Sequence, residues 1–247
     1  MTERRLGWEG CFNVRDLGGH PTEDGRETRM GAVVRADSVR RLTEAGWRSL
    51  VEYGIRRIVD LRLESELDED PPGDVPVEVV HISFLEDIPV ERQIEIFTRW
   101  IDAPDDVAAT RDGYLEMLDT YRGNVAAAVS AVASAAEGGV LIHCMGGKDR
   151  TGLVAALLLR LCGVPIAAIA EDYGLSAENI KPLWQEWVED AGDENERELR
   201  RRLSASPSEA MAQVLESLER EHGSVHSYLL DAGVAEDDLE RALARLR

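Results

Sequence analysis

A cysteine and an arginine are spaced for phosphate chemistry within one ten-residue stretch, His-Cys-Met-Gly-Gly-Lys-Asp-Arg-Thr-Gly. Cys144 follows the apolar run 140–142, and Arg150 comes just before a second apolar run at 153–159. This pattern predicts a buried strand, a tight glycine-rich loop and a helix. The backbone N–H groups of such a loop and the positive helix end form a nest for an oxyanion. A thiolate at its rim is a nucleophile, and an arginine can hold two phosphate oxygens.

The elements that must position this loop can be predicted from periodicity and turn signals. Strands are predicted at 31–37, 55–61 and 77–82, with a short strand or turn at 11–19, and helices at 43–53, 90–100, 113–121, 124–136, 153–161 and from 166 onward. The acidic stretch 64–76 and residues 83–89 are predicted to be loops, and the pattern from 176 to 247 is almost wholly helical. Strands that alternate with helices predict an α/β fold with a parallel core, in which ligands bind at the carboxyl ends of strands.

The composition sets limits on partners. The chain has 247 residues, of which 44% are hydrophobic and 31% charged, so a single domain with a substantial core is expected. The net charge of -20 argues against nucleic acid or an anionic membrane as a general partner. It does not exclude phosphate binding, because distant charges are screened over about 8 Å at physiological salt.

Three cysteines, Cys11, Cys144 and Cys162, give no disulfide framework and combine with no metal-ligand pattern. Cys11 and Cys162 are expected to be packing residues, although a protective disulfide with Cys144 stays open. The first residues lack the apolar stretch of a signal peptide, and no run has the roughly 18 apolar residues of a membrane span. A cytoplasmic location is therefore expected, with export without a cleaved signal left open.

The loop and three further segments resemble the bacterial tyrosine-phosphatase-like branch of the protein tyrosine phosphatase superfamily, which includes lipid- and multi-specific phosphatases. The loop supplies His143-Cys144-x5-Arg150-Thr151 and Gly147-Lys148-Asp149-Arg150-Thr151-Gly152; the other segments are Asn13-Val14-Arg15-Asp16-Leu17-Gly18-Gly19, Val59-Asp60-Leu61-Arg62 with Glu66, and Asp172-Tyr173-Gly174-Leu175-Ser176. Val14 replaces the usual aromatic residue, a change expected to alter packing rather than chemistry.

This resemblance implies a phosphatase-like α/β fold: a central, mostly parallel sheet flanked by helices, with a helical C-terminal extension. Residues 1–247 are expected to form one phosphatase domain, with a catalytic core at about 12–176 and a helical tail at 177–247. The acidic helical segment 178–221 is a candidate lid over the pocket, or a set of peripheral packing helices.

The resemblance also implies roles for the loop residues. Cys144 is the expected nucleophile, and it forms a phosphocysteine that water hydrolyses. Arg150 is expected to bind the equatorial phosphate oxygens. The substrate-binding set is expected to comprise Met145, Gly146, Gly147, Lys148 and Thr151, with a Thr151 hydrogen bond to the Cys144 sulfur. His143 is expected to order the loop, because its side chain points opposite to that of Cys144 on an extended strand.

The proton for the leaving oxygen has three candidate donors. The resemblance favours Asp149, directly before the loop arginine, over Asp87 on a candidate loop and Asp112 as third choice. Supporting roles are open for five residues. Arg15 and Asp16 either brace the loop or fix the Gly18–Gly19 turn, Asp60 and Arg62 form an ion pair or contact substrate, and Asp172 holds the loop or caps a helix.

The predicted function is a metal-independent, cofactor-free hydrolase, a cysteine-dependent protein-tyrosine phosphatase in which dual-specific or phosphoinositide activity stays open. Its partners would be a phosphorylated protein or a phosphoinositide, with inorganic phosphate as product, no nucleic acid and no stable membrane insertion. The alternatives are a non-catalytic phosphate-binding module and a sulfurtransferase, which shares a cysteine loop but does not require this arginine spacing.

Overall fold

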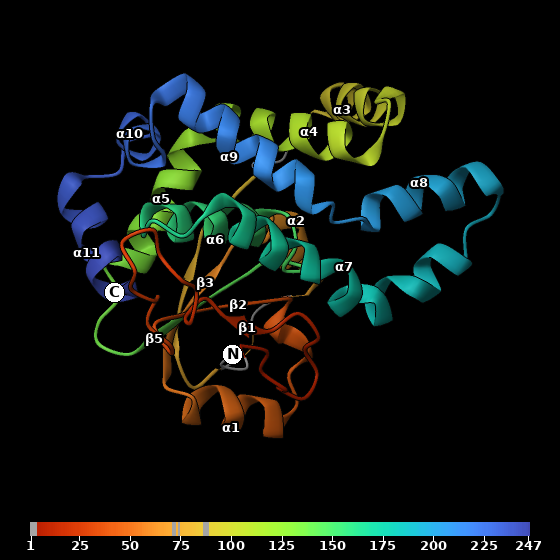
Figure 1. Cartoon of the computed structure of the whole chain (residues 1–247). Helices are drawn as coiled ribbons and strands as arrows, with labels where there is room; N and C mark the ends of the chain where they lie inside the picture. Colours follow the sequence, from red (N-terminus) through yellow and green to blue (C-terminus); the bar gives the residue numbers. More distant parts are fainter. Residues whose placement is uncertain (1–3, 71–72, 74, 86–88) are drawn as a thin grey trace.

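A five-stranded sheet forms the centre of the computed structural model, which describes residues 4–70, 73, 75–85 and 89–247. The strand order is β1-β2-β5-β3-β4, with bounds β1 Arg15–Asp16, β2 Val33–Ala36, β3 Ile55–Asp60, β4 Glu78–His81 and β5 Gly139–His143. β1 pairs with β2 in antiparallel orientation, and the other pairs are parallel. The predicted α/β fold with a mostly parallel sheet is therefore confirmed (Figure 1).

Helices cover both faces of this sheet. They are α1 Glu44–Glu52, α2 Glu64–Glu69, α3 Val90–Asp102, α4 Asp106–Thr120, α5 Arg122–Ala133, α6 Arg150–Leu161, α7 Ile166–Glu189, α8 Glu194–Ser204, α9 Ser208–His222, α10 Val225–Asp231 and α11 Glu236–Leu246, with a short 3-10 helix at Val39–Arg41. Figure 1 shows α1 on one face of the sheet and α5 and α6 on the other. The stretch from 176 to 247, predicted to be almost wholly helical, comprises the end of α7 and the four helices α8 to α11.

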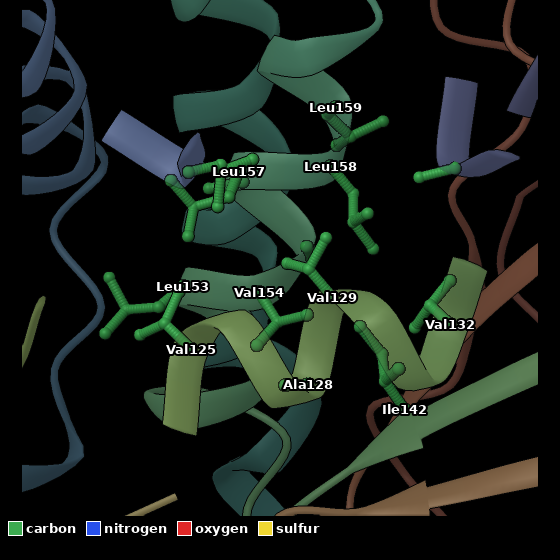
Figure 2. Close-up of a cluster of buried hydrophobic side chains, with 14 of the residues drawn as sticks. Val125, Ala128, Val129, Val132, Ile142, Leu153, Val154, Leu157, Leu158 and Leu159 are labelled. Carbon is green, nitrogen blue, oxygen red and sulfur yellow. The ribbon is translucent and has the colours of Figure 1, made fainter. Parts of the chain in front are cut away.

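Alternating strand residues divide the core between the two faces. Val33 and Val140 pack with α5 and α6 in the larger cluster, whereas Val34 and Leu141 pack with α1 in the smaller one. This is the two-residue period of a strand buried on both faces. In Figure 2, Ile142 of β5 lies among valines of α5 and leucines of α6. The central strands are thus fixed from both sides, which gives the loop after β5 a rigid base.

Helix α6 is buried around its whole circumference. Every residue from Thr151 to Leu159 is buried, so the helix lacks the polar face that a surface helix shows. Its first residue is Arg150, directly after the glycine-rich loop. Because α6 is held within the core, the backbone of Arg150 has a fixed position at the end of the glycine-rich loop.

The helical tail divides into two parts. Helices α9, α10 and α11 contribute Met211, Tyr228 and Leu246 to the larger core, so they belong to the body of the domain. By contrast, α8 has no fully buried residue, and Figure 1 shows it at the far end of α7, away from the sheet. We call residues 183–205, the end of α7 with α8, the arm. The candidate lid, predicted at 178–221, is therefore restricted to the arm, because α9 belongs to the body of the domain.

One predicted loop is partly a helix. The stretch 64–76 begins with α2, Glu64–Glu69. Its first turn is closed by the Glu66 carboxylate, which accepts a hydrogen bond from the Leu63 N–H at 2.6 Å, an interaction that satisfies a free donor at a helix start. The acidic composition of 64–76 is typical of an exposed loop, and it gave no indication that Glu66 caps a helix. Among the described residues, no helix is both long and apolar enough to cross a membrane.

Candidate active site

The glycine-rich loop lies at the carboxyl end of β5, the middle strand of the sheet. Cys144 follows the strand directly and is 1% exposed. Gly147 adopts a φ of 64°, and a Cβ atom at this position would lie 2.3 Å from the Ala36 carbonyl oxygen. Both the left-handed conformation and the close approach require glycine. The tight turn between Cys144 and Arg150 therefore depends on this residue.

The loop carbonyls are bound from outside. The Ser38 N–H donates to the Met145 oxygen at 2.9 Å, and Asn13 Nδ2 donates to the oxygens of Gly146 and Gly147 at 3.0 and 3.1 Å. Because a trans peptide places each N–H opposite the preceding carbonyl, the next N–H groups point to the other side of the chain. This is the arrangement of an oxyanion nest.

A buried network of charges supports the loop from behind. Arg35 donates to the Gly147 oxygen at 2.8 Å and to Asp172 at 3.0 Å. Arg15 and Arg4 also donate to the Asp172 carboxylate, at 3.1 and 2.8 Å. Burial would raise the pKa of Asp172, but the guanidinium groups outweigh it and hold that pKa well below its usual range. Asp172 is therefore an anion that orients Arg35, not a helix cap, since it lies inside α7.

Arg15 and Asp16 have different positions although they are adjacent. Arg15 is 1% exposed and belongs to the network behind the loop. The Asp16 carboxylate instead accepts from the N–H groups of Gly18 and Gly31, both at 2.6 Å. Of the two alternatives left open, bracing fits Arg15, and fixing the glycine turn fits Asp16.

Arg150 is paired with a carboxylate from α2. Its Nη2 donates to Glu66 Oε1 at 2.9 Å, and its Nη1 donates to the other Glu66 oxygen. Burial would lower the pKa of Arg150, but the charges of Cys144 and Glu66 outweigh it and raise that pKa. A two-point pair of this kind fixes the plane of the guanidinium group. Glu66 was singled out only as part of a sequence segment, without a role.

Lys148 contacts the arm. Its Nζ donates to the carbonyl oxygens of Leu203 and Ala205 at 2.6 and 2.9 Å. These bonds use two of the three ammonium N–H donors, so one is left for the expected contact with substrate phosphate. A second contact lies nearby, because a Cβ atom on Gly146 would be 3.4 Å from the Trp184 ring. The arm therefore contacts the loop near both of its own ends, at Trp184 and at Leu203 with Ala205.

Asp149 is held by a tyrosine from α4. The Tyr114 hydroxyl donates to Asp149 Oδ1 at 2.6 Å and lies 2.8 Å from the Tyr173 hydroxyl. Lys148 Nζ is 3.4 Å from the same carboxylate oxygen. The Asp149 side chain is 43% exposed, so its second oxygen is accessible to a bound molecule.

Asp112, the third candidate acid, is not brought to the loop. Asp112 lies on α4, bonds to Arg111 at 2.7 Å and has a side chain that is 64% exposed. Asp112 lines a cavity bounded by α3, α4, α9 and α10, and Asp149 does not line this cavity. Asp87 lies outside the described residues.

Three buried residues lie beneath the loop. His143 Nδ1 is 3.1 Å from the Cys144 carbonyl oxygen, and since a carbonyl only accepts, this nitrogen carries the proton. Burial lowers the pKa of His143, so the ring is neutral. Asp60 accepts hydrogen bonds from the backbone N–H and the guanidinium group of Arg62, which is fully buried. Asp60 and Arg62 thus form the ion pair of the two alternatives, and His143 is placed to order the loop.

The expected hydrogen bond from Thr151 to the Cys144 sulfur is not formed. Thr151 Oγ1 is buried and has no hydrogen-bond partner among the described residues. Cys11, Cys144 and Cys162 are all free thiols, and Cys162 is buried as expected for a packing residue.

A cavity of about 700 Å³ opens beside the loop. Lys148, Asp149 and Arg150 line it, and most of its remaining wall is apolar or aromatic. The wall comes mainly from α3 and α4 and includes Leu63, Leu85, Ile96, Trp100, Tyr114, Met117, Tyr121 and Leu203. Within the described parts of the chain, His, Cys, Asp and Glu side chains form no group of three able to hold a metal ion.

Comparison with known proteins identifies the family. A model described as "Tyrosine phosphatase family" matches residues 6–247. The chain belongs to the tyrosine phosphatase family. A tyrosine-protein phosphatase of Nostoc commune is 29% identical over 87% of this chain and 74% of its own length. A triple specificity protein phosphatase of Mycobacterium tuberculosis is 28% identical over 94% of this chain and 95% of its own length.

A third relative, a putative tyrosine-protein phosphatase of Cupriavidus necator, is 28% identical over 68% of this chain and 61% of its own length. Membership of the tyrosine phosphatase family makes the protein a phosphatase, which is a hydrolase. The predicted resemblance to the bacterial branch is confirmed.

Besides Glu66, three site residues had no predicted role. Arg35 could have been noticed, since a charged residue within a strand predicted to be buried requires a partner. Asn13 lay in the N-terminal segment that carried the resemblance, but its contact with the loop depends on the fold. Tyr114 gave no signal, because one tyrosine on a predicted helix is an ordinary core residue.

Proposed function

We propose that this phosphatase is a cysteine-dependent phosphomonoesterase that forms a phosphocysteine intermediate on Cys144. The observation that carries this proposal is the position of Cys144 at the end of β5, with Arg150 opening α6 on the far side of the glycine loop. The outward-bound carbonyls support it, because they leave the N–H groups of Gly146, Gly147 and Lys148 for phosphate oxygens.

In the proposed first step, the Cys144 thiolate attacks phosphorus and forms the S–P bond. The bond from phosphorus to the leaving oxygen breaks, and its electron pair stays on that oxygen. Asp149, protonated on Oδ2, donates its proton to the leaving oxygen. Arg150, oriented by Glu66, binds two equatorial phosphate oxygens and stabilises the negative charge on them in the transition state.

In the second step, water attacks the phosphocysteine. The Asp149 carboxylate accepts a proton from the water as the O–P bond forms, and the S–P bond breaks with its electron pair returning to sulfur. Inorganic phosphate is released and the thiolate is restored. The residues that act are supplied by the chain itself, so the proposed reaction needs no metal or cofactor.

We propose phosphotyrosine in proteins as the first substrate. The cavity wall supports an aromatic substrate, because Trp100, Tyr114 and Tyr121 can pack against a ring while the phosphate reaches Arg150. Two relatives are named tyrosine-protein phosphatases and one a triple specificity phosphatase. Phosphoserine, phosphothreonine and phosphoinositides are therefore included as further candidate substrates.

The arm supports the proposal of a lid. It touches the loop through Lys148 and Trp184 and supplies Leu203 to the cavity wall, whereas α8 itself has no fully buried residue. Such a segment can leave the loop at lower cost than a core helix. The arm is the part of the tail for which we retain this role.

The test of the proposed function is hydrolysis of 4-nitrophenyl phosphate by the purified protein in the presence of a metal chelator. We expect turnover by the wild type and a loss of at least about 10³-fold in Cys144→Ser, because the nucleophile is removed. Cys162→Ser is the matched control, since Cys162 is also a buried free thiol but lies at the end of α6. It should retain activity.

A second arm of the experiment identifies the substrate. Phosphotyrosine, phosphoserine and phosphothreonine peptides and short-chain phosphoinositides are compared by phosphate release. Turnover that persists in Cys144→Ser would overturn the cysteine mechanism. Phosphate binding by the wild type without any turnover would instead favour the non-catalytic binding module.

A further inference from the structure

Tyr114 contributes a buried hydroxyl at the edge of the candidate site. The residue lies on α4, is 3% exposed and donates a hydrogen bond of 2.6 Å to Asp149 Oδ1. Burial, and after it the Asp149 carboxylate, raises the pKa of Tyr114 well above its ordinary value. The hydroxyl therefore stays protonated and remains a donor to Asp149.

We infer that Tyr114 is the positioning residue for the proton transfer by Asp149, an inference that rests on the proposed function. Asp149 directly precedes α6, and its side chain is 43% exposed and makes no capping hydrogen bond to that helix, so contacts with other residues must fix the carboxyl plane. Tyr114 and Lys148 both lie against Oδ1. The oxygen left to carry and transfer the proton is therefore Oδ2.

The tyrosine is itself firmly held. Its ring packs edge-on against Tyr173, with ring centroids 6.0 Å apart, and the two hydroxyl oxygens are 2.8 Å apart. Tyr173 lies on α7 and is 1% exposed. Two buried rings on separate helices thus fix the donor, and a fixed donor orients the carboxyl group before substrate binds.

The proton balance follows from this geometry. As the bond between phosphorus and the leaving oxygen breaks, the Oδ2 proton moves to that oxygen and Asp149 becomes a carboxylate. The Tyr114 hydroxyl keeps its own proton throughout and donates to the new negative charge. Its effect must then be largest when the leaving oxygen is strongly basic and needs the proton before it can depart.

The experiment compares Tyr114→Phe with the wild type on two aryl phosphates that differ in their leaving group. With phenyl phosphate, a poor leaving group, we expect kcat to fall about 10-fold, a part of the 10²–10⁴-fold that a general acid supplies. With 4-nitrophenyl phosphate, kcat should change less than about 3-fold, because this leaving group needs little protonation. KM should be unchanged for both, since Tyr114 acts on the transfer and not on binding.

A matched control separates positioning from stability. Tyr228→Phe also removes a buried tyrosine hydroxyl, which donates to the Leu118 carbonyl oxygen at 2.8 Å. A purely structural role for Tyr114 predicts that both variants lose the same activity on both substrates, with similar losses in melting temperature. That result would overturn the inference.

A double mutant gives an independent readout. If Tyr114 acts through Asp149, Tyr114→Phe should have no further effect in an Asp149→Asn background; additive losses would contradict the inference. The two hypotheses also fail differently. Leaving-group dependence in Asp149→Asn but not in Tyr114→Phe refutes only the role of Tyr114, whereas its absence in Asp149→Asn refutes Asp149 as the acid.

Discussion

At the residue scale, Arg150 is oriented by a single carboxylate, that of Glu66. The pair with Glu66 uses both terminal nitrogens, which orients the guanidinium plane but also places a negative charge beside the proposed phosphate site. Orientation should dominate, because a bidentate pair fixes an otherwise flexible side chain. In the proposed mechanism, Arg150 then binds phosphate without a further loss of side-chain entropy.

The change Glu66→Gln tests this balance. It keeps the side-chain volume but removes the charge, so Arg150 gains rotamers and we expect kcat/KM to fall about 10-fold. Steady-state hydrolysis of an aryl phosphate measures it. Glu64→Gln is the control on the same helix, since its side chain is 69% exposed and lies near His81. Equal activity of both variants, or a faster Glu66→Gln enzyme, would show that the charge of Glu66 only hinders phosphate.

At the element scale, α6 and the arm have opposite stabilities. Helix α6 is buried on all sides, whereas α8 carries exposed ion pairs such as Arg197 with Glu194 and Arg201 with Glu198. Exposed pairs each contribute less than about 1 kcal/mol. The two carbonyl bonds to Lys148 therefore form a large part of what fastens the arm to the loop.

Removal of those bonds should loosen the arm and leave the core unchanged. In Lys148→Met we expect amide hydrogen exchange in α8 to become about 30-fold faster, because two hydrogen bonds of roughly 1 kcal/mol each are lost. Hydrogen-exchange mass spectrometry measures this, with α6 as the internal reference. An arm that is as protected as α6 in the wild type, and unaffected by phosphate, would contradict its role as a lid.

The same contrast explains what the sequence could predict. The loop between β5 and α6 was predictable because its signals are local: an apolar strand, adjacent glycines and an apolar helix. Helix α2 was not predictable from local patterns. Its N-terminal cap depends on the Glu66 carboxylate, which also pairs with Arg150, 84 residues away in the sequence. Tyr114 and Arg35 contact the loop only through the fold. Pairings of this length depend on tertiary packing, which local patterns do not encode.

At the scale of the whole molecule, the charge distribution is opposite inside and outside. The chain carries a net charge of -20, yet behind the loop three guanidinium groups converge on the single carboxylate of Asp172. Buried charges are screened far less than exposed ones. The field at the loop is therefore set by this cluster and not by the acidic surface.

The cluster also makes stability depend on pH through His20. Burial, and after it the adjacent Arg4, lowers the pKa of His20 from 6.5 to about 4; Arg15, Arg35 and Asp172 are its other charged neighbours. Between these values the unfolded chain binds a proton that the folded protein does not. The free energy of unfolding thus falls as pH drops from 6.5 toward 4, by on the order of 3 kcal/mol from this group.

Urea unfolding of the wild type and His20→Gln at pH 7 and pH 4.5 measures this contribution. The variant should lose about 2 kcal/mol less than the wild type between the two pH values, because glutamine does not titrate. Parallel losses in both proteins would mean that carboxylates alone cause the acid sensitivity.

The outward-bound carbonyls of the loop have a kinetic consequence. Asn13, Arg35 and Ser38 hold the loop through bonds within the chain itself, so in the proposed mechanism the nest is shaped for a tetrahedral oxyanion before substrate arrives. It is equally shaped for the inorganic phosphate that a completed reaction leaves behind. Under the proposed mechanism, product and substrate compete for one preformed site, so accumulating phosphate should raise the apparent KM and leave kcat unchanged.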